Sequence, residues 1–512
     1  MENTAHERHR DFGKRFIGGL SWTVGAQATA QVVTLVSSIL LARLLVPKDF
    51  GILSMALAYI GFLFLVGQTG LNSAIVYLDE VSALDLHTMY WANLAVSLFL
   101  FILAVLLAPL IGTFFHSPQV VPVIRFASLL LVVSALGGVQ KTLLEKRMDF
   151  RGLARNQLAA SIVYSVTAVT LAIAGIGVWS LVVAKVLEQV TDSVLAAFGS
   201  RWWPRFAFSR ISFRRLMSYG GRVWVGNVLF YGQENIDNLV VGRVLGATML
   251  GFYSFAFRLA NAPRYFFAGV ISRVMFPIFS SGRGQIHTLK KAYLRINAYS
   301  ILAAGGLCTG LAMVASEAIR VLYGPKWVPA TTTLRIVAIA AGVYGVSQIA
   351  APALMAMGKP EVQAKLVGTS SLVLLVGALV GVRFGIVGVA VSVLVAASVA
   401  LGLAQYSVAR TLGVGRVEYV RAVLPPAVGI GAMCLAVVVW RSFGYAWFAM
   451  SGAVWLVIAV LLGGAALIGG FLLADPRQVS DFGEFLRPPE SGSEPVLATS
   501  PRHNGQEAQE LV

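Results

Sequence analysis

Charged residues are scarce in this chain. They make up 12% of its 512 residues, whereas hydrophobic residues make up 57% and the mean hydropathy is +0.77. Soluble globular domains carry about twice this charged fraction. The composition excludes an ordinary soluble domain and indicates a protein that lies mostly within a membrane.

Cysteine and the usual signatures of metal or nucleotide chemistry are also lacking. The two cysteines, Cys308 and Cys434, both fall within apolar stretches, which excludes a disulfide framework. No His and Cys spacing predicts a metal site, and the glycine-rich stretches lack the Gly-Lys-Ser/Thr ending of a phosphate-binding loop. We therefore expect no metal, no cofactor and no ATP-driven step. The first 16 residues are polar and the next apolar run is long, so we expect no cleavable signal peptide.

Long apolar runs are what the chain has in abundance. Met89–Phe114 contains no charged residue, and similar runs recur along almost the whole length. A window of about 20 apolar residues crosses the hydrocarbon core as a helix. The sequence predicts an all-α polytopic membrane protein with about 14 transmembrane helices.

Lysine and arginine fix the expected orientation. With a cytoplasmic N-terminus, 26 of the 40 Lys and Arg residues lie in cytoplasmic segments and 7 lie in outer turns. This bias predicts that both termini are cytoplasmic. It also explains the net charge of +17 without nucleic acid, although contacts with anionic membrane lipids are expected.

Two segments about 200 residues apart share one pattern. Arg43-Leu44-Leu45 is followed by Gly51, Ser54 and Ala56, and Arg243-Val244-Leu245 by Gly251, Ser254 and Ala256 at the same spacing. The duplication predicts two pseudo-symmetric six-helix bundles in the same orientation. We interpret Gly51 and Gly251 as residues of tight turns or helix starts. We interpret Arg43 and Arg243 as cations near helix C-termini.

The expected boundaries follow from the duplication and the polar segments. They are a cytoplasmic tail at 1–16, a first bundle at 17–200, a cytoplasmic linker at 201–215, a second bundle at 216–410, two extra helices at 422–474 and a disordered cytoplasmic tail at 475–512.

Five short motifs follow one another in order along the chain. They are Gly67-Gln68-Thr69-Gly70-Leu71, Leu144-Glu145-Lys146-Arg147-Met148-Asp149-Phe150-Arg151, the stretch from Asn235 to Arg258, Met275-Phe276-Pro277, and Leu322-Tyr323-Gly324-Pro325-Lys326-Trp327-Val328-Pro329. Together they cover roughly residues 15–440 and resemble the Wzx-type polysaccharide flippases, most of all the exopolysaccharide and colanic-acid branch. This branch belongs to the multidrug/oligosaccharidyl-lipid/polysaccharide superfamily.

The resemblance implies a function and a location. It implies alternating access between two bundles and transfer of an undecaprenyl-pyrophosphate-linked oligosaccharide across a bacterial inner membrane, for exopolysaccharide or lipopolysaccharide synthesis. A polysaccharide polymerase and a chain-length regulator are the protein partners it suggests. It implies a transporter that is not an enzyme.

Charged residues inside the predicted spans are the candidate functional residues, because a charge in the bilayer costs roughly 3 kcal/mol or more unless it has a partner or a wet cavity. Lys185, Glu188 and Asp192 share one helix face. Lys185 is a candidate for the substrate pathway, and the two acids are candidates for ion or proton coupling. The alternative is an internal ion pair between Lys185 and Glu188.

Two further groups lie in the seventh and eighth predicted spans. Glu234 and Asp237 are candidates for ion or proton coupling, and the alternative is structural hydrogen bonding between helices. Arg222, Arg258, Arg264 and Arg273 are candidates for the substrate pathway, since arginine binds phosphate oxygens in pairs. Arg222 and Arg273 alternatively extend to the lipid headgroups.

Three other functions remain open at this point. A cation-coupled exporter of small molecules would have the same superfamily fold. A membrane polymerase or ligase of lipid-linked sugars is the enzymatic alternative, and the short outer turns disfavour it. A flippase for peptidoglycan precursors would share the fold without these motifs.

The orientation gives the first prediction. In a variant without Cys308 and Cys434, an impermeant thiol reagent applied to intact cells should label Ser117→Cys and leave Arg210→Cys unlabelled until the cells are permeabilised. The reverse labelling pattern would show that the predicted topology is inverted.

Overall fold

The structure is a computed structural model, which describes the backbone of residues 25–67, 81–281, 286–447 and 451–474. Within these ranges it does not describe the side chains of 215–230, 233, 265–288, 356 and 444–447. Every described element is a helix, which confirms the predicted all-α fold. Eleven helical stretches are long and apolar enough to cross a membrane, and one of them, Pro360–Leu412, contains two helices. The predicted count of 14 is not confirmed.

The first half of the molecule runs from the first helix to α8. Its described helices are the first helix (Gly25–Leu44), α2 (Pro47–Gly67), α4 (Ala83–Phe114), α5 (Val120–Ala127), α6 (Leu129–Lys146), α7 (Phe150–Ile173) and α8 (Val178–Ser200). A capping box starts α4, in which Ser82 Oγ accepts from the Asp85 backbone N–H and the Asp85 carboxylate accepts from the Ser82 N–H.

The second half runs from α9 to α15. Its elements are α9 (Arg210–Ser281), α10 (Ile286–Ser300), a π-helix η1 (Ile301–Gly305), α11 (Gly306–Ala318), a π-helix η2 (Ile319–Tyr323), a 3₁₀-helix η3 (Pro325–Ala330), α12 (Thr331–Ser347), α13 (Ala350–Ala356), α14 (Pro360–Gly381), a 3₁₀-helix η4 (Val382–Phe384) and α15 (Gly385–Leu412). Two further helices follow, α16 (Arg416–Trp447) and α17 (Gly452–Ala474).

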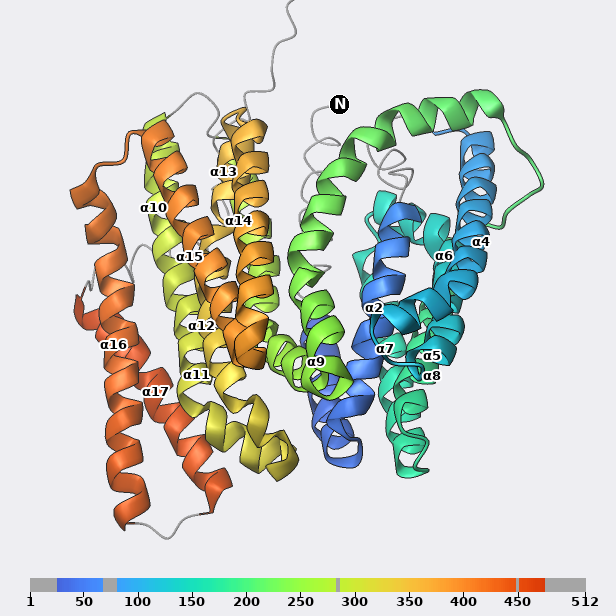
Figure 1. The fold of residues 1–512 in the computed structure, drawn as a ribbon. Coiled ribbons are helices and arrows are strands. Elements are labelled where there is room, and N and C mark those ends of the chain that lie inside the picture. The colour runs from blue at the N-terminus through green and yellow to red at the C-terminus, as the bar shows by residue number, and fades with distance from the viewer. Residues whose placement is uncertain (1–24, 68–80, 282–285, 448–450, 475–512) are drawn as a thin grey trace, which may run out of the picture.

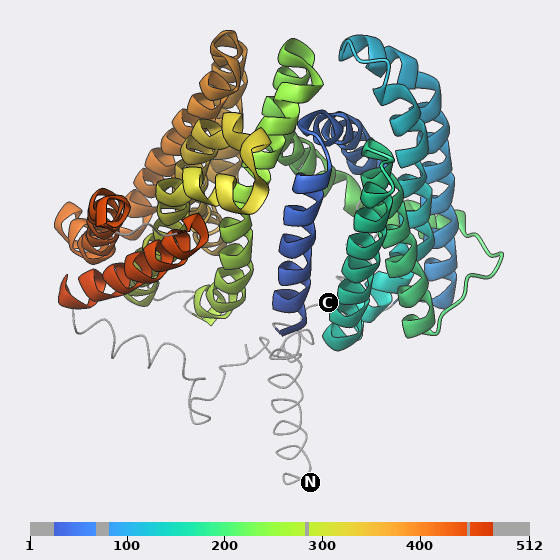
Figure 2. The same cartoon turned by 90° about the horizontal axis from the view of Figure 1, so that it is seen from below.

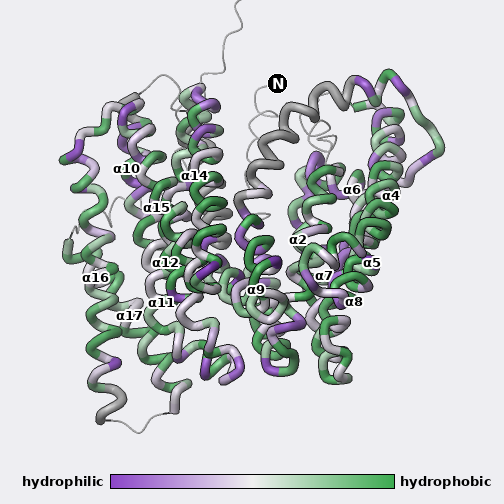
Figure 3. The backbone as a smooth tube through the Cα atoms, in the orientation of Figure 1, coloured by the Kyte–Doolittle hydropathy of each residue, from purple (hydrophilic) through white to green (hydrophobic). Residues whose placement is uncertain are grey.

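The halves form two groups of helices that converge at one end and diverge at the other (Figure 1). We call the converging end the hairpin end, because it carries the turns after Leu44, Phe114, Tyr323 and Gly381. The opposite end carries the connection 201–209, and we call it the linker end. Figure 2 shows the first helix and α9 between the two groups. Hydrophobic residues cover most of the helix length, and hydrophilic residues gather near the ends and around α9 (Figure 3). The domain boundaries given above stay predictions.

A single glycine bends α9 back on itself. Gly246 has φ 81° and ψ −179°, a conformation that L side chains strongly disfavour. The bend lets residues from the two segments of α9 touch one another, as Arg264 and Glu234 do across 30 positions. It also corresponds in the duplicated pattern to the turn between the first helix and α2.

The two halves meet at a backbone contact between α2 and the second segment of α9. A methyl group on Gly51 would lie 1.7 Å from the Ala247 carbonyl oxygen, and one on Gly251 would lie 1.8 Å from the Pro47 carbonyl oxygen. These four residues are related by the offset of 200, so the contact is symmetric. Gly51 and Gly251 lie within helices, without a positive φ. The tight-turn part of our interpretation is therefore wrong: both glycines lie near the start of a helical segment, where their small size allows the helices to cross.

Two ion pairs attach α16, the first of the two extra helices, to the second half. Arg441 of α16 pairs with the buried Glu317 of α11 at 3.1 Å, near the hairpin end. Lys290 of α10 pairs with Glu418 of α16 at 2.6 Å, at the other end. In Figure 2 these helices lie on the outer side of the second half, away from the first half.

The glycine contact gives the second prediction. Gly51→Ala should destabilise the folded protein by about 1–3 kcal/mol or more, because the added methyl group overlaps the backbone of α9. Gly138→Ala in α6 is the matched control, since open space surrounds that glycine and alanine favours a helix by about 1 kcal/mol. Thermal unfolding of the purified protein should show a lower transition temperature for the first variant only. Equal transition temperatures for the two variants would show that α2 and α9 move apart at Gly51 without loss of stability.

Candidate functional site

Two separate cavities border α9, and four of the nine candidate charges line them. The first lies between the halves, and we call it the inter-half cavity. It has a volume of about 100 Å³ and is lined by residues of the first helix, α2, α7, α9 and η2. The second, the second-half cavity, has a volume of about 40 Å³ and lies among α9, α12, α14 and α15.

Arg258 is the charged residue that lines the inter-half cavity. Its side chain is exposed, and among the described residues its guanidinium group makes no hydrogen bond or ion pair. Hydroxyl and amide groups of both halves line the same cavity, from Gln31, Thr34, Ser37, Ser38, Tyr164, Ser254 and Tyr323. An arginine free to bind an anion therefore lies beside groups that can form hydrogen bonds with sugars.

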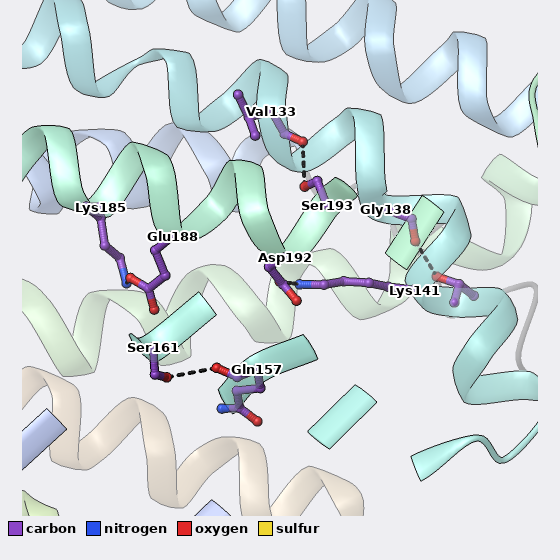
Figure 4. A network of polar contacts seen from close by, with 10 residues as sticks. Val133, Gly138, Lys141, Gln157, Ser161, Lys185, Glu188, Asp192 and Ser193 are labelled. Carbon is purple, nitrogen blue, oxygen red and sulfur yellow. Dashed lines mark hydrogen bonds and ion pairs between the residues drawn. The ribbon is translucent and has the colours of Figure 1, made fainter. Parts of the chain in front are cut away.

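Figure 4 shows the charged side chains of α8, and Tyr164, which lines the inter-half cavity, lies next to Lys185 of this helix. Lys185 Nζ pairs with Glu188 Oε2 at 2.7 Å, and it also lies 5.9 Å from the centroid of the Tyr164 ring. Asp192 points toward Lys141 of α6 and pairs with it (Figure 4). The predicted internal pair between Lys185 and Glu188 is therefore present. The sequence analysis did not identify Lys141, because its partner lies on a different helix.

The second-half cavity contains an ion pair of the two segments of α9. Arg264 Nη2 donates to Glu234 Oε1 at 2.9 Å, and the Arg264 guanidinium lies 4.5 Å from the centroid of the Tyr344 ring of α12. Arg264 is only 5% exposed. The sequence analysis placed Arg258 and Arg264 in one pathway, whereas the structure places them in two different cavities.

Asp237 lines the same cavity and is 1% exposed. Tyr253 Oη donates to Asp237 Oδ2 at 2.6 Å, and the Asn238 backbone N–H donates to Oδ1 at 2.8 Å. Asn261 also lines the cavity, and its Oδ1 has no hydrogen-bond partner among the described residues. The cavity thus brings together two carboxylates and an amide oxygen, ligand types that hard cations prefer.

The remaining candidates lie outside the described side chains. The backbone of Arg222 and Arg273 belongs to α9, but their side chains are not described. Tyr253 and Tyr344, which contact the buried charges, were not among the residues predicted to have a role. A tyrosine in an apolar span indicates that its hydroxyl group makes a hydrogen bond, but it does not indicate which residue is the partner.

A family model for polysaccharide biosynthesis proteins matches residues 40–332. Among characterised relatives, the succinoglycan biosynthesis transport protein ExoT of Rhizobium meliloti is 29% identical, over 67% of this chain and 69% of its own. The lipopolysaccharide biosynthesis protein WzxC of Escherichia coli is 26% identical, over 69% of this chain and 72% of its own. The teichuronic acid biosynthesis protein TuaB of Bacillus subtilis is 24% identical, over 64% and 68%.

Solved structures show the same fold at low sequence identity. The lipid II flippase MurJ in an inward closed conformation has a TM-score of 0.73 at 15% identity, covering 90% of this chain and 99% of its own. An inward-facing multidrug transporter of the MATE family has a TM-score of 0.60 at 15% identity, and the match covers 75% of this chain and 95% of the transporter. The chain thus shares the fold of these two proteins, and its many long apolar helices are those of a multi-pass membrane protein. The chain belongs to the polysaccharide biosynthesis protein family.

Proposed function

We propose that the protein flips polyprenyl-pyrophosphate-linked oligosaccharide units across the bacterial inner membrane by alternating access. The observation that carries the proposal is Arg258, an exposed cation in a cavity lined by both halves. Relatives named for succinoglycan transport, lipopolysaccharide synthesis and teichuronic acid synthesis support a lipid-linked sugar as the cargo. The protein is not an enzyme in this proposal, and both termini are cytoplasmic.

The inter-half cavity matches two parts of this cargo. A pyrophosphate is a compact anion that the guanidinium group of Arg258 binds through paired hydrogen bonds. The hydroxyl groups around it provide donors and acceptors for a sugar. Because residues of both halves line the cavity, a movement of one half against the other changes which side of the membrane it faces. Lys185 lies near enough, beside Tyr164, to contribute a second cation if its pair with Glu188 opens.

The second-half cavity is the proposed site of energy coupling. Glu234, Asp237 and the unpartnered oxygen of Asn261 provide a set of oxygens for a proton or a small cation. An ion bound there competes with Arg264 for the Glu234 carboxylate. Occupancy would then alter the contact between the two segments of α9, and differential occupancy is what shifts a conformational equilibrium. Glu188 and Asp192 are paired with lysines on the other side of the molecule and serve as second candidates.

The small-molecule exporter is the second candidate function. It shares the fold, and an exporter of organic cations would require an acidic or aromatic cavity. Arg258, which no described residue pairs with in the inter-half cavity, favours an anionic cargo instead. Polysaccharide polymerase and chain-length regulator partners belong to the flippase proposal, since polymerisation on the outer face would remove the transported units.

The third prediction concerns Arg258. Arg258→Gln should reduce transport of a labelled lipid-linked oligosaccharide in proteoliposomes by roughly 10- to 100-fold, as expected from losing a charged hydrogen bond. Arg258→Lys should retain part of the activity, because it keeps the charge and loses the planar geometry. Arg155→Gln, an exposed arginine of α7, is the matched control and should transport normally. Normal transport by Arg258→Gln would show that Arg258 does not bind the pyrophosphate of the cargo.

The fourth prediction concerns coupling. Asp237→Asn combined with Glu234→Gln should abolish the response of transport to an imposed proton or sodium gradient, while binding of the lipid-linked oligosaccharide persists. The measurement compares proteoliposomes with and without each gradient. Tyr253→Phe is a milder variant that keeps both carboxylates and should retain the response. If wild-type transport ignores both gradients, the two acids are structural, and removal of product by polymerisation drives the cycle.

A further inference from the structure

The two halves make reciprocal contacts at the hairpin end. In each contact, an arginine of one half binds a helix C-terminus of the other half. Arg43 of the first helix donates to the carbonyl oxygens of Leu322 and Val321, at 2.8 and 2.5 Å. These carbonyls end η2, the last turn of the helical run 286–323. A cation at a helix C-terminus is stabilised by the unpaired carbonyls and the helix dipole.

Arg243 makes the corresponding contact in the opposite direction. It belongs to α9, and its Nη1 donates to the Phe114 carbonyl oxygen at 2.6 Å, at the last residue of α4. The same nitrogen lies 2.6–2.7 Å from the ring nitrogens of His116. Our interpretation of both arginines as cations near helix C-termini agrees with these contacts. The sequence analysis did not show that each helix terminus belongs to the other half.

The symmetry of these contacts follows the duplication. Arg43 and Arg243 are 200 residues apart. The helix that each one caps is the third predicted span of the opposite half, α4 in one case and the run 286–323 in the other. One side is reinforced, since Lys326 Nζ donates to the carbonyl oxygens of Arg43 and Leu45 at 2.6 Å. Trp327 Nε1 donates to the Ala42 carbonyl oxygen at 2.8 Å and is fully buried.

We propose that Arg43 and Arg243 are the two gating residues of the hairpin end, which hold it closed by capping helix termini across the two halves. This inference rests on alternating access as proposed above. Opening the hairpin end separates the first helix from residues 319–327 and α9 from α4. Neither arginine can then keep its carbonyl partners, so both contacts break in the open state. Their role in transport is to set the fraction of molecules closed at this end.

The test measures distances between spin labels by pulsed electron resonance, with the full chain in lipid nanodiscs and without substrate. Labels at Gln119→Cys and Thr332→Cys report on the hairpin end, one in each half, in a variant with Cys308→Ala and Cys434→Ala. Both positions are exposed. Arg43→Gln and Arg243→Gln should each increase the population at long distance by roughly 5- to 20-fold, the range expected for a charged cap. The double variant should increase it further.

Two controls separate gating from a general loss of charge. Arg383→Gln removes an exposed cation of η4 near the same end that makes no hydrogen bond or ion pair among the described residues, so distances should not change. Arg43→Lys keeps the cation and should restore most of the closed population. An unchanged distance distribution in the folded double variant would overturn the proposal.

A second experiment leaves both arginines in place, which avoids any loss of folding. Ser117→Cys in the first half and Val244→Cys in the second half lie next to the contact between Arg243 and His116. Joining them with a flexible bismaleimide should stop transport of the labelled lipid-linked oligosaccharide, while the unlinked variant transports normally. Normal transport by the linked protein would show that this end need not open. If the wild type transports no such lipid, the flippase proposal fails, and the distance measurement still decides the gating proposal.

Discussion

The backbone contact between α2 and α9 at Gly51 and Gly251 sets the geometry of the rest of the molecule. A side chain on either glycine would overlap a carbonyl group of the facing helix, so the two helices approach one another as closely as backbones allow. This approach brings the turn after Leu44 and the bend at Gly246 to the same end of the molecule. The arginines just before them, Arg43 and Arg243, then reach helix termini of the opposite half. The inter-half cavity lies between the same helices, with Phe50 of α2 and Ser254 of α9 in its lining.

The low-dielectric surroundings explain how the other charges are arranged. Glu234 pairs with Arg264, Lys185 with Glu188, Asp192 with Lys141, and Glu317 with Arg441. Pairing reduces the free-energy cost of a charge within a membrane. Arg258 departs from this pattern, because no described residue neutralises it. A cation without a partner among the described residues is available to a ligand that binds and leaves, and this is the physical basis of the proposal that Arg258 binds the cargo.

Much of the architecture was predictable from local patterns. Apolar runs predicted the helical membrane fold, and the repeated pattern after Arg43 and Arg243 predicted the duplication. Several of the charged positions were also identified, because a charged residue within an apolar run stands out, although Lys141 and Glu317 were not among them. The partners of these charged residues were harder to predict from the sequence. Spacing predicted the pair within α8, since Lys185 and Glu188 lie one turn apart, whereas Lys141, Tyr253 and Tyr344 approach their partners only after the chain has folded.

The sequence by itself determined that the chain is a helical, multi-pass membrane protein with a repeated element, because hydrophobicity and repeat spacing are properties of the chain read in order. Only the tertiary structure decided the partners of charges that lie far apart in the sequence. It separated Arg258 from Arg264 into two cavities, gave Asp192 a partner on α6 and placed the Gly51–Gly251 pair in a helix crossing rather than a turn. The physical reason is that the cost of a buried charge depends on the distance to the nearest opposite charge or wet surface. That distance is set by how helices far apart in the sequence pack together.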